Sequence, residues 1–181
     1  MLLRLFLSVI VAFVWIVENA MAADPENTIY LELEHGRVVI ELRPDLAPNH
    51  VNRIKELARE EFYDGVVFHR VIEGFMAQTG DPTGTGTGGS DKPDLDAEFS
   101  DEPHVRGTLS MARTNDPNSA NSQFFIVFEG ASHLNGQYTV WGQVTEGMEH
   151  VDKIKRGGGQ NGMVDDPDKI VTMRVAADVD E

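Results

Sequence analysis

Polar and apolar residues alternate in two short segments near the start of the chain, residues 28–33 and 37–42. Such alternation is typical of strands with one buried face. Glu34-His35-Gly36 lies between the two segments, and its glycine can adopt the positive φ that a tight turn requires. The pattern therefore predicts an opening β-hairpin.

Two later stretches have helical periodicity instead. Pro48 is suited to the first position of a helix, and the apolar residues after it recur at helical spacing until about Glu61. This predicts one amphipathic helix. A second, shorter helix is predicted over residues 148–154, where apolar side chains again share one face.

The remaining periodic segments read as strands. Runs rich in β-branched and aromatic residues predict six more, at residues 66–72, 75–79, 107–112, 123–128, 139–144 and 170–175. A parallel sheet would need a helix in nearly every crossover, so eight strands with two helices favour antiparallel pairing. We therefore predict a mainly β fold, a closed eight-stranded antiparallel β-barrel capped by two α-helices. A single domain over residues 24–178 accommodates all of these elements.

Residues 1–22 differ in composition from the rest of the chain. Arg4 precedes an apolar run over residues 5–17, and Ala20-Met21-Ala22 supplies the small residues of a cleavage position. This is the pattern of a secretory signal peptide, cut near its end. The run is shorter than the roughly 20 residues that cross a bilayer. We expect export with no stable membrane insertion after cleavage; an uncleaved N-terminal anchor is the alternative.

The chain is acidic, with a formal net charge of −15 at pH 7. Nucleic acids and anionic lipid surfaces are bound by basic patches, so neither is an expected partner. The sequence contains no cysteine. In an exported protein this excludes disulfides as a source of stability and thiols as catalytic groups. The oligomeric state is not determined by the sequence, and a monomer is the simplest expectation.

Residues 68–78, FHRVIEGFMAQ, combine a cation, an amide and apolar side chains in one short segment. A tight turn at Glu73-Gly74 would pair the two halves of the segment as strands. Arg70 would then lie within a residue or two of Met76 and Gln78 across the ladder. This predicts a guanidinium group beside an apolar surface and an amide.

A second strand can contribute to the same cleft. Alternation along residues 123–128 puts Gln123 and Phe125 on one face, so that another amide and an aromatic ring are available there. An apolar pocket with a few converging polar groups is the expected form of a small binding site. Residues 80–103 are rich in Gly, Asp and Thr without periodicity, which predicts a functional loop.

Other chemical motifs are weak. The glycine-rich residues 84–89 have no following Lys-Ser/Thr and no helix start, so a phosphate-binding loop is not predicted. Asp165, Asp166 and Asp168 lack the alternating ligands and terminal Glu of an EF-hand loop. The six histidines form no pair at metal-binding spacing. We therefore expect neither a metal nor a cofactor.

Several separated motifs resemble those of the cyclophilin family of peptidyl-prolyl cis-trans isomerases, in the family's order and spacing: FHRVIEGFMAQTGDPTGTGTGG, GTLSMAR, NSANSQFFIVF and HLNGQYTVWGQV. The resemblance implies an eight-stranded barrel and a groove that binds X-Pro segments of unfolded or partly folded proteins. It implies Arg70 as the catalytic residue. The residues that it implies for substrate binding are Phe75, Met76, Gln78, Ala112, Arg113, Gln123, Phe125, His133, Leu134 and Tyr138.

Arginine suits the implied reaction. The prolyl nitrogen is a poor hydrogen-bond acceptor while its lone pair is delocalised, and it becomes an acceptor when the peptide bond twists. A donor from Arg70 would thus bind the transition state selectively. Considered alone, Arg70 would more often be a solvated or salt-bridged surface residue, and the apolar residues ordinary core; the whole set of motifs reverses this. His69 should point to the opposite strand face and is predicted to be structural.

Two positions depart from the best-known eukaryotic pattern. His133 stands where those proteins often carry Trp, and Tyr138 where they carry His. Losing the indole removes apolar surface and an N–H donor, so we expect weak binding of cyclosporin-type ligands with isomerase activity retained. A Tyr at 138 is familiar in bacterial relatives, and together with the signal pattern it favours a periplasmic location, with secretion or a membrane anchor as alternatives.

Two other functional classes stay open at this point. A proline-peptide-binding chaperone module would have the same fold and groove without essential turnover, and Arg70 is the feature that it would not need. A structural envelope protein held by its N-terminal segment is the other. The groove reads one proline and its backbone neighbours, so the client proteins are not identified by the sequence.

Overall fold

The computed structural model describes residues 24–158 and 161–179. The predicted signal segment, residues 1–22, lies outside this part of the chain. The strands are β1 (Thr28–Leu33), β2 (Gly36–Leu42), β3 (Arg70–Ile72), β4 (Met76–Thr79), β5 (Thr108–Met111), β6 (Phe124–Val127), β7 (Val140–Glu146) and β8 (Ile170–Val175). The helices are α1 (Pro48–Arg59) and α2 (Met148–Val151), with short 3₁₀ turns at Pro25–Asn27, Ser132–Leu134 and Ala176–Asp178. None of the described helices is long and apolar enough to cross a membrane.

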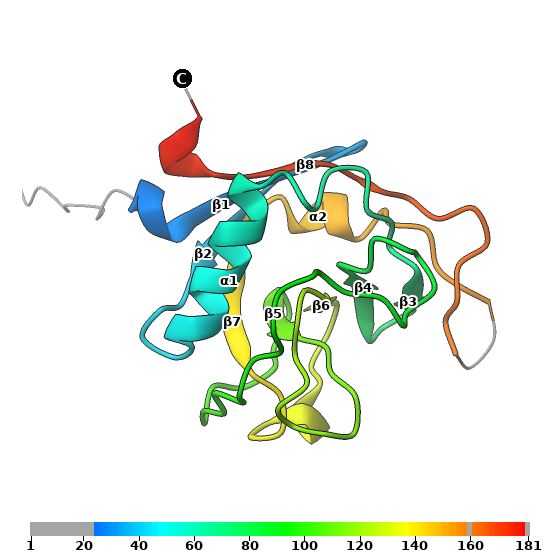
Figure 1. Ribbon diagram of the computed structural model, residues 1–181. Helices are drawn as coiled ribbons and strands as arrows, with labels where there is room; N and C mark the ends of the chain where they lie inside the picture. The colour runs from blue at the N-terminus through cyan, green and yellow to red at the C-terminus, as the bar shows by residue number, and fades with distance from the viewer. Residues whose placement is uncertain (1–23, 159–160, 180–181) are drawn as a thin grey trace, which may run out of the picture.

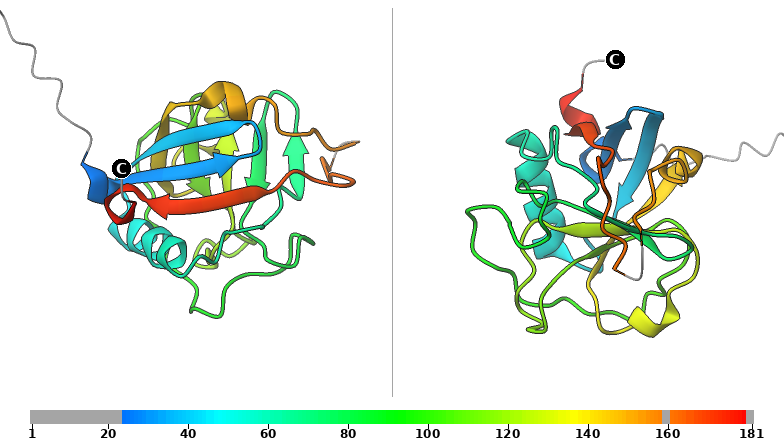
Figure 2. Two further views of the ribbon diagram at one scale, coloured as in Figure 1. Left: turned by 90° about the horizontal axis from the view of Figure 1, so that it is seen from above. Right: turned by 90° about the vertical axis from the view of Figure 1, so that its right-hand side faces the viewer.

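The eight strands form one antiparallel sheet in the order β3-β4-β6-β5-β7-β2-β1-β8, which curls into a half-barrel (Figures 1 and 2). The predicted closed barrel is wrong, because β3 and β8 form no ladder with each other. The predicted strand 66–72 is also too long. Its first half makes only an isolated bridge, between Val67 and Lys169, and the ladder begins at Arg70.

The opening hairpin has the predicted form. Leu33 pairs with Gly36 at the turn, and Gly36 has φ +135°. A Cβ at this position would come within 2.6 Å of Nε2 of His150. Glycine is therefore required here both by the backbone and by the close approach of α2.

Helix α1 begins at Pro48 as predicted and ends two residues earlier than expected. Glu61 has φ +58°, and the amide of Phe62 donates to the carbonyl oxygen of Leu57, which is a Schellman-type end. Helix α2 is one turn, shorter than the predicted 148–154. The amides of Lys153 and Ile154 donate three residues back instead of four, so the α-helix does not continue.

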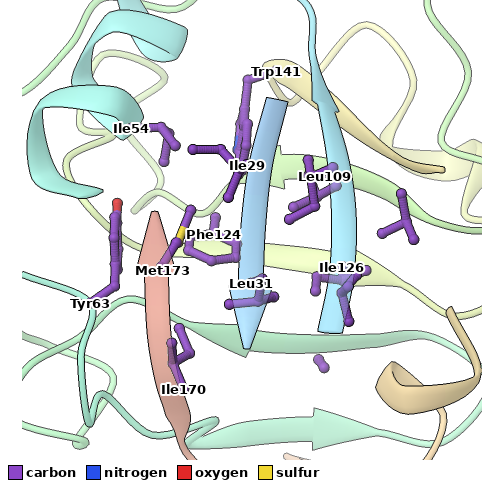
Figure 3. Close-up of a cluster of buried hydrophobic side chains, with 14 of the residues drawn as sticks. Ile29, Leu31, Ile54, Tyr63, Leu109, Phe124, Ile126, Trp141, Ile170 and Met173 are labelled. Carbon is purple, nitrogen blue, oxygen red and sulfur yellow. The ribbon is translucent and has the colours of Figure 1, made fainter. Parts of the chain in front are cut away.

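The main core lies between the concave face of the sheet and α1 (Figure 3). Phe124 is at its centre, edge-on to Trp141 at a ring distance of 5.4 Å and to Tyr63 at 5.5 Å. Strand β6 is buried on both faces, as predicted. Phe124 and Ile126 belong to the main core, whereas Phe125 belongs to a smaller apolar cluster on the other face.

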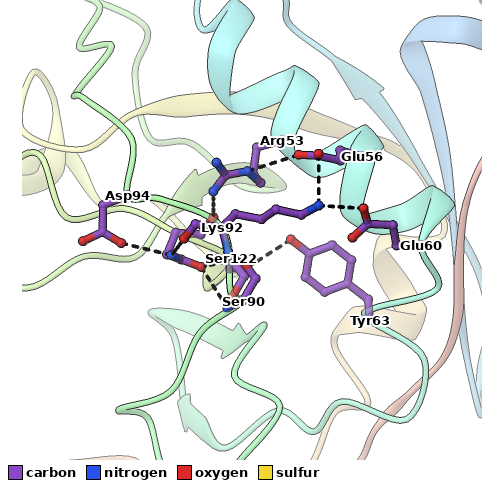
Figure 4. A network of polar contacts seen from close by, with 9 residues as sticks. Arg53, Glu56, Glu60, Tyr63, Ser90, Lys92, Asp94 and Ser122 are labelled. Carbon is purple, nitrogen blue, oxygen red and sulfur yellow. Dashed lines mark hydrogen bonds and ion pairs between the residues drawn. The ribbon is translucent and has the colours of Figure 1, made fainter.

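The long segment between β4 and β5 is irregular, as predicted, and polar contacts hold it against α1 (Figure 4). Nζ of Lys92 lies 2.6 Å from a carboxylate oxygen of Glu60 and 3.1 Å from one of Glu56. Oδ1 of Asn121 accepts hydrogen bonds from the backbone and hydroxyl of Ser90. The segment is thus fastened on two sides, by α1 and by Asn121.

Candidate functional site

Strands β3 and β4 form the predicted tight hairpin. Arg70 pairs with Gln78 and Ile72 with Met76, around a turn in which Gly74 has φ +68°. The pairing places the guanidinium group beside the amide, and Nη1 of Arg70 donates to Oε1 of Gln78 at 3.2 Å. The sequence-based expectation for this pair is confirmed.

Arg70 has a second partner that the sequence did not indicate. Its Nε donates to the carbonyl oxygen of Asn161 at 2.9 Å. The carbonyl oxygen of Gly162 accepts from the amide of Val71 at 2.7 Å, so this segment runs directly beside β3. A side chain on Gly162 would overlap Ile72. The glycine-rich run at 157–162 is the only signal in the sequence for this close approach.

The two glutamines form a chain of hydrogen bonds that leads away from Arg70. Nε2 of Gln78 donates to Oε1 of Gln123 at 2.9 Å. Nε2 of Gln123 donates in turn to the carbonyl oxygens of Gly88, at 2.8 Å, and Gly86, at 3.2 Å. The orientation of both side-chain amides is therefore defined by their partners.

An apolar pocket of about 200 Å³ opens beside the hydrogen bonds that link Arg70, Gln78 and Gln123. Met76, Phe125 and Leu134 are almost fully buried in its floor, and Tyr138 stands edge-on to Phe125 at a ring distance of 5.9 Å. The pocket combines an apolar floor with the polar groups of Arg70 and Gln78. We call the hydrogen-bonded series Arg70–Gln78–Gln123 the relay. The residues that line it are Arg70, Phe75, Met76, Gln78, Ala112, Arg113, Phe125, Leu134 and Tyr138.

Of the residues predicted for the site, two lie outside this pocket. Gln123 is reached through Gln78, as described above. His133 is exposed at the rim, with its ring 5.3 Å from that of Phe75. His69, directly before β3, is buried and does not line the pocket; its structural role stays a prediction.

The sequence matches the family model described as "Cyclophilin type peptidyl-prolyl cis-trans isomerase/CLD" over residues 28–175. The chain belongs to the cyclophilin family. A relative from Brucella suis biovar 1 (strain 1330), named "Probable peptidyl-prolyl cis-trans isomerase", is 59% identical over 174 residues, 90% of this chain and 89% of the relative. Peptidyl-prolyl cis-trans isomerase B of Bacillus subtilis (strain 168) is 46% identical over 134 residues, 72% of this chain and 92% of the relative.

Solved cyclophilin structures agree with the fold. Cyclophilin AquaCyp293 from Hirschia baltica matches with a TM-score of 0.78 at 31% identity, over 87% of this chain and 77% of that chain. A Cryptosporidium parvum cyclophilin, crystallised in the presence of the dipeptide Ala-Pro, has a TM-score of 0.76 at 29% identity, over 82% and 98% of the two chains. The present chain is thus a peptidyl-prolyl cis-trans isomerase of class EC 5.2.1.8, which acts on proline-containing peptides.

In this cyclophilin, Arg113 lines both the apolar pocket and a second hollow of about 440 Å³, as do Gln78 and Ala112. Its Nη1 and Nη2 each donate at 2.8 Å, to the carbonyl oxygens of Thr114 and Gln137. The guanidinium group also lies 4.4 Å from the centre of the Tyr138 ring. These contacts hold Arg113 as a fixed wall.

His104 supports the pocket floor from below, and the sequence analysis missed it. Its ring is stacked on Phe125 at 6.3 Å, with Nδ1 3.1 Å from Oδ1 of Asn135 and Nε2 3.0 Å from Oγ of Ser110. Burial lowers the pKa of His104, so the ring is neutral at pH 7. No spacing rule joins His104 to Phe125, because the contact is made only when the sheet curls.

Within residues 24–158 and 161–179, no group of three or more His, Cys, Asp or Glu side chains is arranged to hold a metal ion. The chemistry available at the described site is that of a guanidinium group, two amides and an apolar pocket. These groups can bind a peptide and donate hydrogen bonds to it.

Proposed function

We propose that Arg70 is the catalytic residue of this isomerase and that the apolar pocket holds the substrate proline. The observation that carries the proposal is the way the guanidinium group is held. Nε is occupied by Asn161 and Nη1 by Gln78, and no hydrogen bond within the described residues uses Nη2. Nη2 is therefore available to a peptide in the pocket that Arg70 borders.

The reaction is a rotation about the X-Pro bond, without bond cleavage. The uncatalysed barrier is about 18–20 kcal/mol because the nitrogen lone pair is delocalised into the carbonyl group. When the bond is twisted by about 90°, the lone pair is localised on the prolyl nitrogen. A donor from Nη2 of Arg70 then gains a hydrogen bond that the planar ground state does not offer, which is differential binding of the transition state.

The size of the effect is physically reasonable. An acceleration of about 10⁵ corresponds to roughly 7 kcal/mol of barrier reduction. A charge-assisted hydrogen bond, a desolvated amide and a tightly held ring can supply this together. Arginine serves better than lysine because its planar group can be held by two partners while a third N–H faces the substrate.

The remaining site residues are proposed to bind the peptide. The proline ring packs on the apolar floor formed by Phe75, Met76, Phe125 and Leu134. Gln78, Ala112, Arg113 and Gln123 contact the peptide on either side, and His133 and Tyr138 border the pocket. The floor residues are support for this assignment because they form one continuous apolar cluster, separate from the main core.

The test is Arg70→Ala, measured in a protease-coupled assay with an X-Pro peptide. Truncation of a half-buried side chain on a short strand should leave the unfolding transition close to that of the wild type. We expect kcat/KM to fall at least 100-fold, about 2.7 kcal/mol. Arg37→Ala, on an exposed arginine of β2, is the control for loss of one positive charge. A folded Arg70→Ala enzyme with the wild-type rate would exclude the proposed role.

We further propose that the protein works in the periplasm, on exported proteins during folding. The support is the signal pattern of residues 1–22, where Arg4 and an apolar run precede Ala20-Met21-Ala22. Cell fractionation and mass spectrometry of the mature N-terminus test this. Cleavage near Ala22 with soluble periplasmic protein is expected, whereas membrane retention of the full chain would indicate an anchor and a cytoplasmic full-length protein would refute export.

A further inference from the structure

Asp81 follows β4 directly, and its side chain is fully buried. Its carboxylate accepts five hydrogen bonds from the loop that follows. Oδ1 accepts from the amide and the hydroxyl of Thr83, both at 2.8 Å. Oδ2 accepts from the amides of Gly86, at 2.6 Å, and Gly88, at 3.1 Å, and from the hydroxyl of Thr85 at 3.4 Å. One carboxylate thus binds four of the six residues 83–88: Thr83, Thr85, Gly86 and Gly88.

The loop is built to fit this carboxylate. Gly84 and Gly86 have φ +68° and +86°, and in this backbone the amides of Thr83, Gly86 and Gly88 all point to the carboxylate. A Cβ on Gly88 would overlap Oδ1 of Asp81. Burial raises the pKa of Asp81, but the hydrogen bonds from Gly88, Thr83 and Gly86 outweigh it and lower the pKa to about 2, so the group is ionised at neutral pH.

The inward turn of the amides directs two carbonyl oxygens of the loop outward, toward the site. Those of Gly86 and Gly88 both accept from Nε2 of Gln123. Rotating that amide by 180° would place its oxygen against two carbonyl oxygens, so the loop determines which end of Gln123 faces Gln78.

The same logic extends to Arg70. Because Oε1 of Gln123 faces Gln78, Gln78 must present its Nε2 there and turn its own Oε1 to Arg70. Only Oε1 can accept the guanidinium hydrogen bond. A continuous series of contacts therefore links Asp81, through the loop carbonyl groups and the side-chain amides of Gln123 and Gln78, to Arg70. At each hydrogen bond only one assignment of donor and acceptor is possible.

We propose that Asp81 is a positioning residue for the isomerase reaction. It holds residues 83–88 so that Gly86 and Gly88 orient Gln123 and Gln78, and through them Arg70. The proposal rests on the proposed catalytic role of Arg70. Asp81 itself does not line the apolar pocket or contact the peptide. Because Gln78 and Gln123 are also proposed to contact the peptide, loss of Asp81 should lower kcat by a larger factor than it raises KM.

The experiment compares Asp81→Asn with Asp96→Asn. Both variants remove one negative charge from the same long segment, but Asp96 is exposed and accepts no hydrogen bond within the described residues. In Asp81→Asn, the amide NH₂ must face donors of the loop on one side. We expect kcat to fall about tenfold, since small misplacements of catalytic groups are costly, with KM within about twofold. Asp96→Asn should match the wild type.

Two further measurements separate positioning from general stability. The side-chain amide resonances of Gln78 and Gln123 in ¹H–¹⁵N NMR spectra should shift in Asp81→Asn and stay in place in Asp96→Asn. In an Arg70→Ala background, Asp81→Asn should cause no additional loss of rate, because the relay then has nothing to position. A folded Asp81→Asn enzyme with wild-type kcat, or with unshifted glutamine resonances, would overturn the proposal.

Thr83→Ala covers the case in which Asp81→Asn does not fold. Thr83 is exposed, and its hydroxyl is one of the five donors to Asp81. We expect the side-chain amide resonances of Gln78 and Gln123 to shift and kcat to fall by a smaller factor than in Asp81→Asn. Unchanged resonances together with an unchanged kcat would contradict the positioning role of Asp81. Arg70→Ala separates the two proposals. If Arg70 is not the catalytic residue, Arg70→Ala keeps full activity, whatever the result for the Asp81 variants. If Arg70 is catalytic but Asp81 does not position it, Arg70→Ala loses activity and Asp81→Asn does not.

Discussion

Nη1 of Arg70 lies 3.2 Å from Oε1 of Gln78, its direct partner across the β3–β4 pair. Because the carbonyl oxygen of Asn161 holds Nε at the same time, the plane of the guanidinium group is defined by two contacts from different segments. Nη2 makes no hydrogen bond within the described residues, and Arg70 lines the apolar pocket. Each contact can be removed separately.

Gln78→Ala removes the first contact. We expect kcat to fall about tenfold or more, because a hydrogen bond to a charged group is worth about 1.5–3 kcal/mol. The protease-coupled assay measures the change, and urea unfolding checks the fold. Asn52→Ala, which removes an exposed side-chain amide on α1 that makes no hydrogen bond within the described residues, is the control and should keep the wild-type rate. Equal rates for Gln78→Ala and the wild type would contradict the interpretation.

Gly162→Ala tests the second contact. Gly162 has φ +66°, and a Cβ there would overlap Ile72, so the substitution should push the carbonyl oxygen of Asn161 away from Arg70. Gly136→Ala is a matched control, since Gly136 has φ +68° but no atom within 4 Å of the added Cβ. Both variants should lose about 1–2 kcal/mol from backbone strain, and only Gly162→Ala should lose activity beyond that. Similar activity losses in the two variants would show that the overlap does not reach Arg70.

The free energy of unfolding should decrease below about pH 6.5. Burial lowers the pKa of His50, His69 and His104 from the ordinary value of 6.5, so the unfolded chain binds protons first as the pH falls. The stability is fully present above pH 6.5 and is lost toward the lower folded pKa, by up to about 1.4 kcal/mol per pH unit for each group. Asp81 adds a separate loss below its ordinary value of 3.8.

Urea unfolding between pH 8 and 5 measures this slope. His69 is the residue to replace, since neither ring nitrogen has a hydrogen-bond partner in the described structure. His69→Leu should reduce the slope, whereas His35→Gln, at an exposed position, should not. A stability that is constant or increases from pH 7 to 5 would be incompatible with three buried neutral histidines.

Cyclosporin A should inhibit the wild-type enzyme weakly. His133 is exposed at the pocket rim beside Phe75 and offers less apolar surface than an indole. His133→Trp adds a large ring and an N–H donor, so its inhibition constant should be lower than that of the wild type. Nanomolar inhibition of the wild type, or no gain in His133→Trp, would show that residue 133 does not limit the affinity.

Some features of this protein follow from the sequence alone because they depend on near neighbours. The opening hairpin, the start of α1 at Pro48 and the Arg70–Gln78 pair each arise within about a dozen residues. There, alternation and turn glycines determine the pairing. The two buried faces of β6 were likewise predicted from its continuous apolar run.

The tertiary structure decided what depends on distant or irregular segments. The sheet stays open because residues 66–69 make an isolated bridge instead of a ladder, and β-propensity does not report pairing partners. Three contacts to the site could not be predicted from residue type: the backbone carbonyl groups of Asn161 and Gly88, and the ring of His104 stacked on Phe125. The sequence by itself pointed to most of the side chains that line the pocket, but not to His104 beneath it. Folding decided how they are oriented, because each orientation is imposed by a carbonyl group or ring from a remote part of the chain.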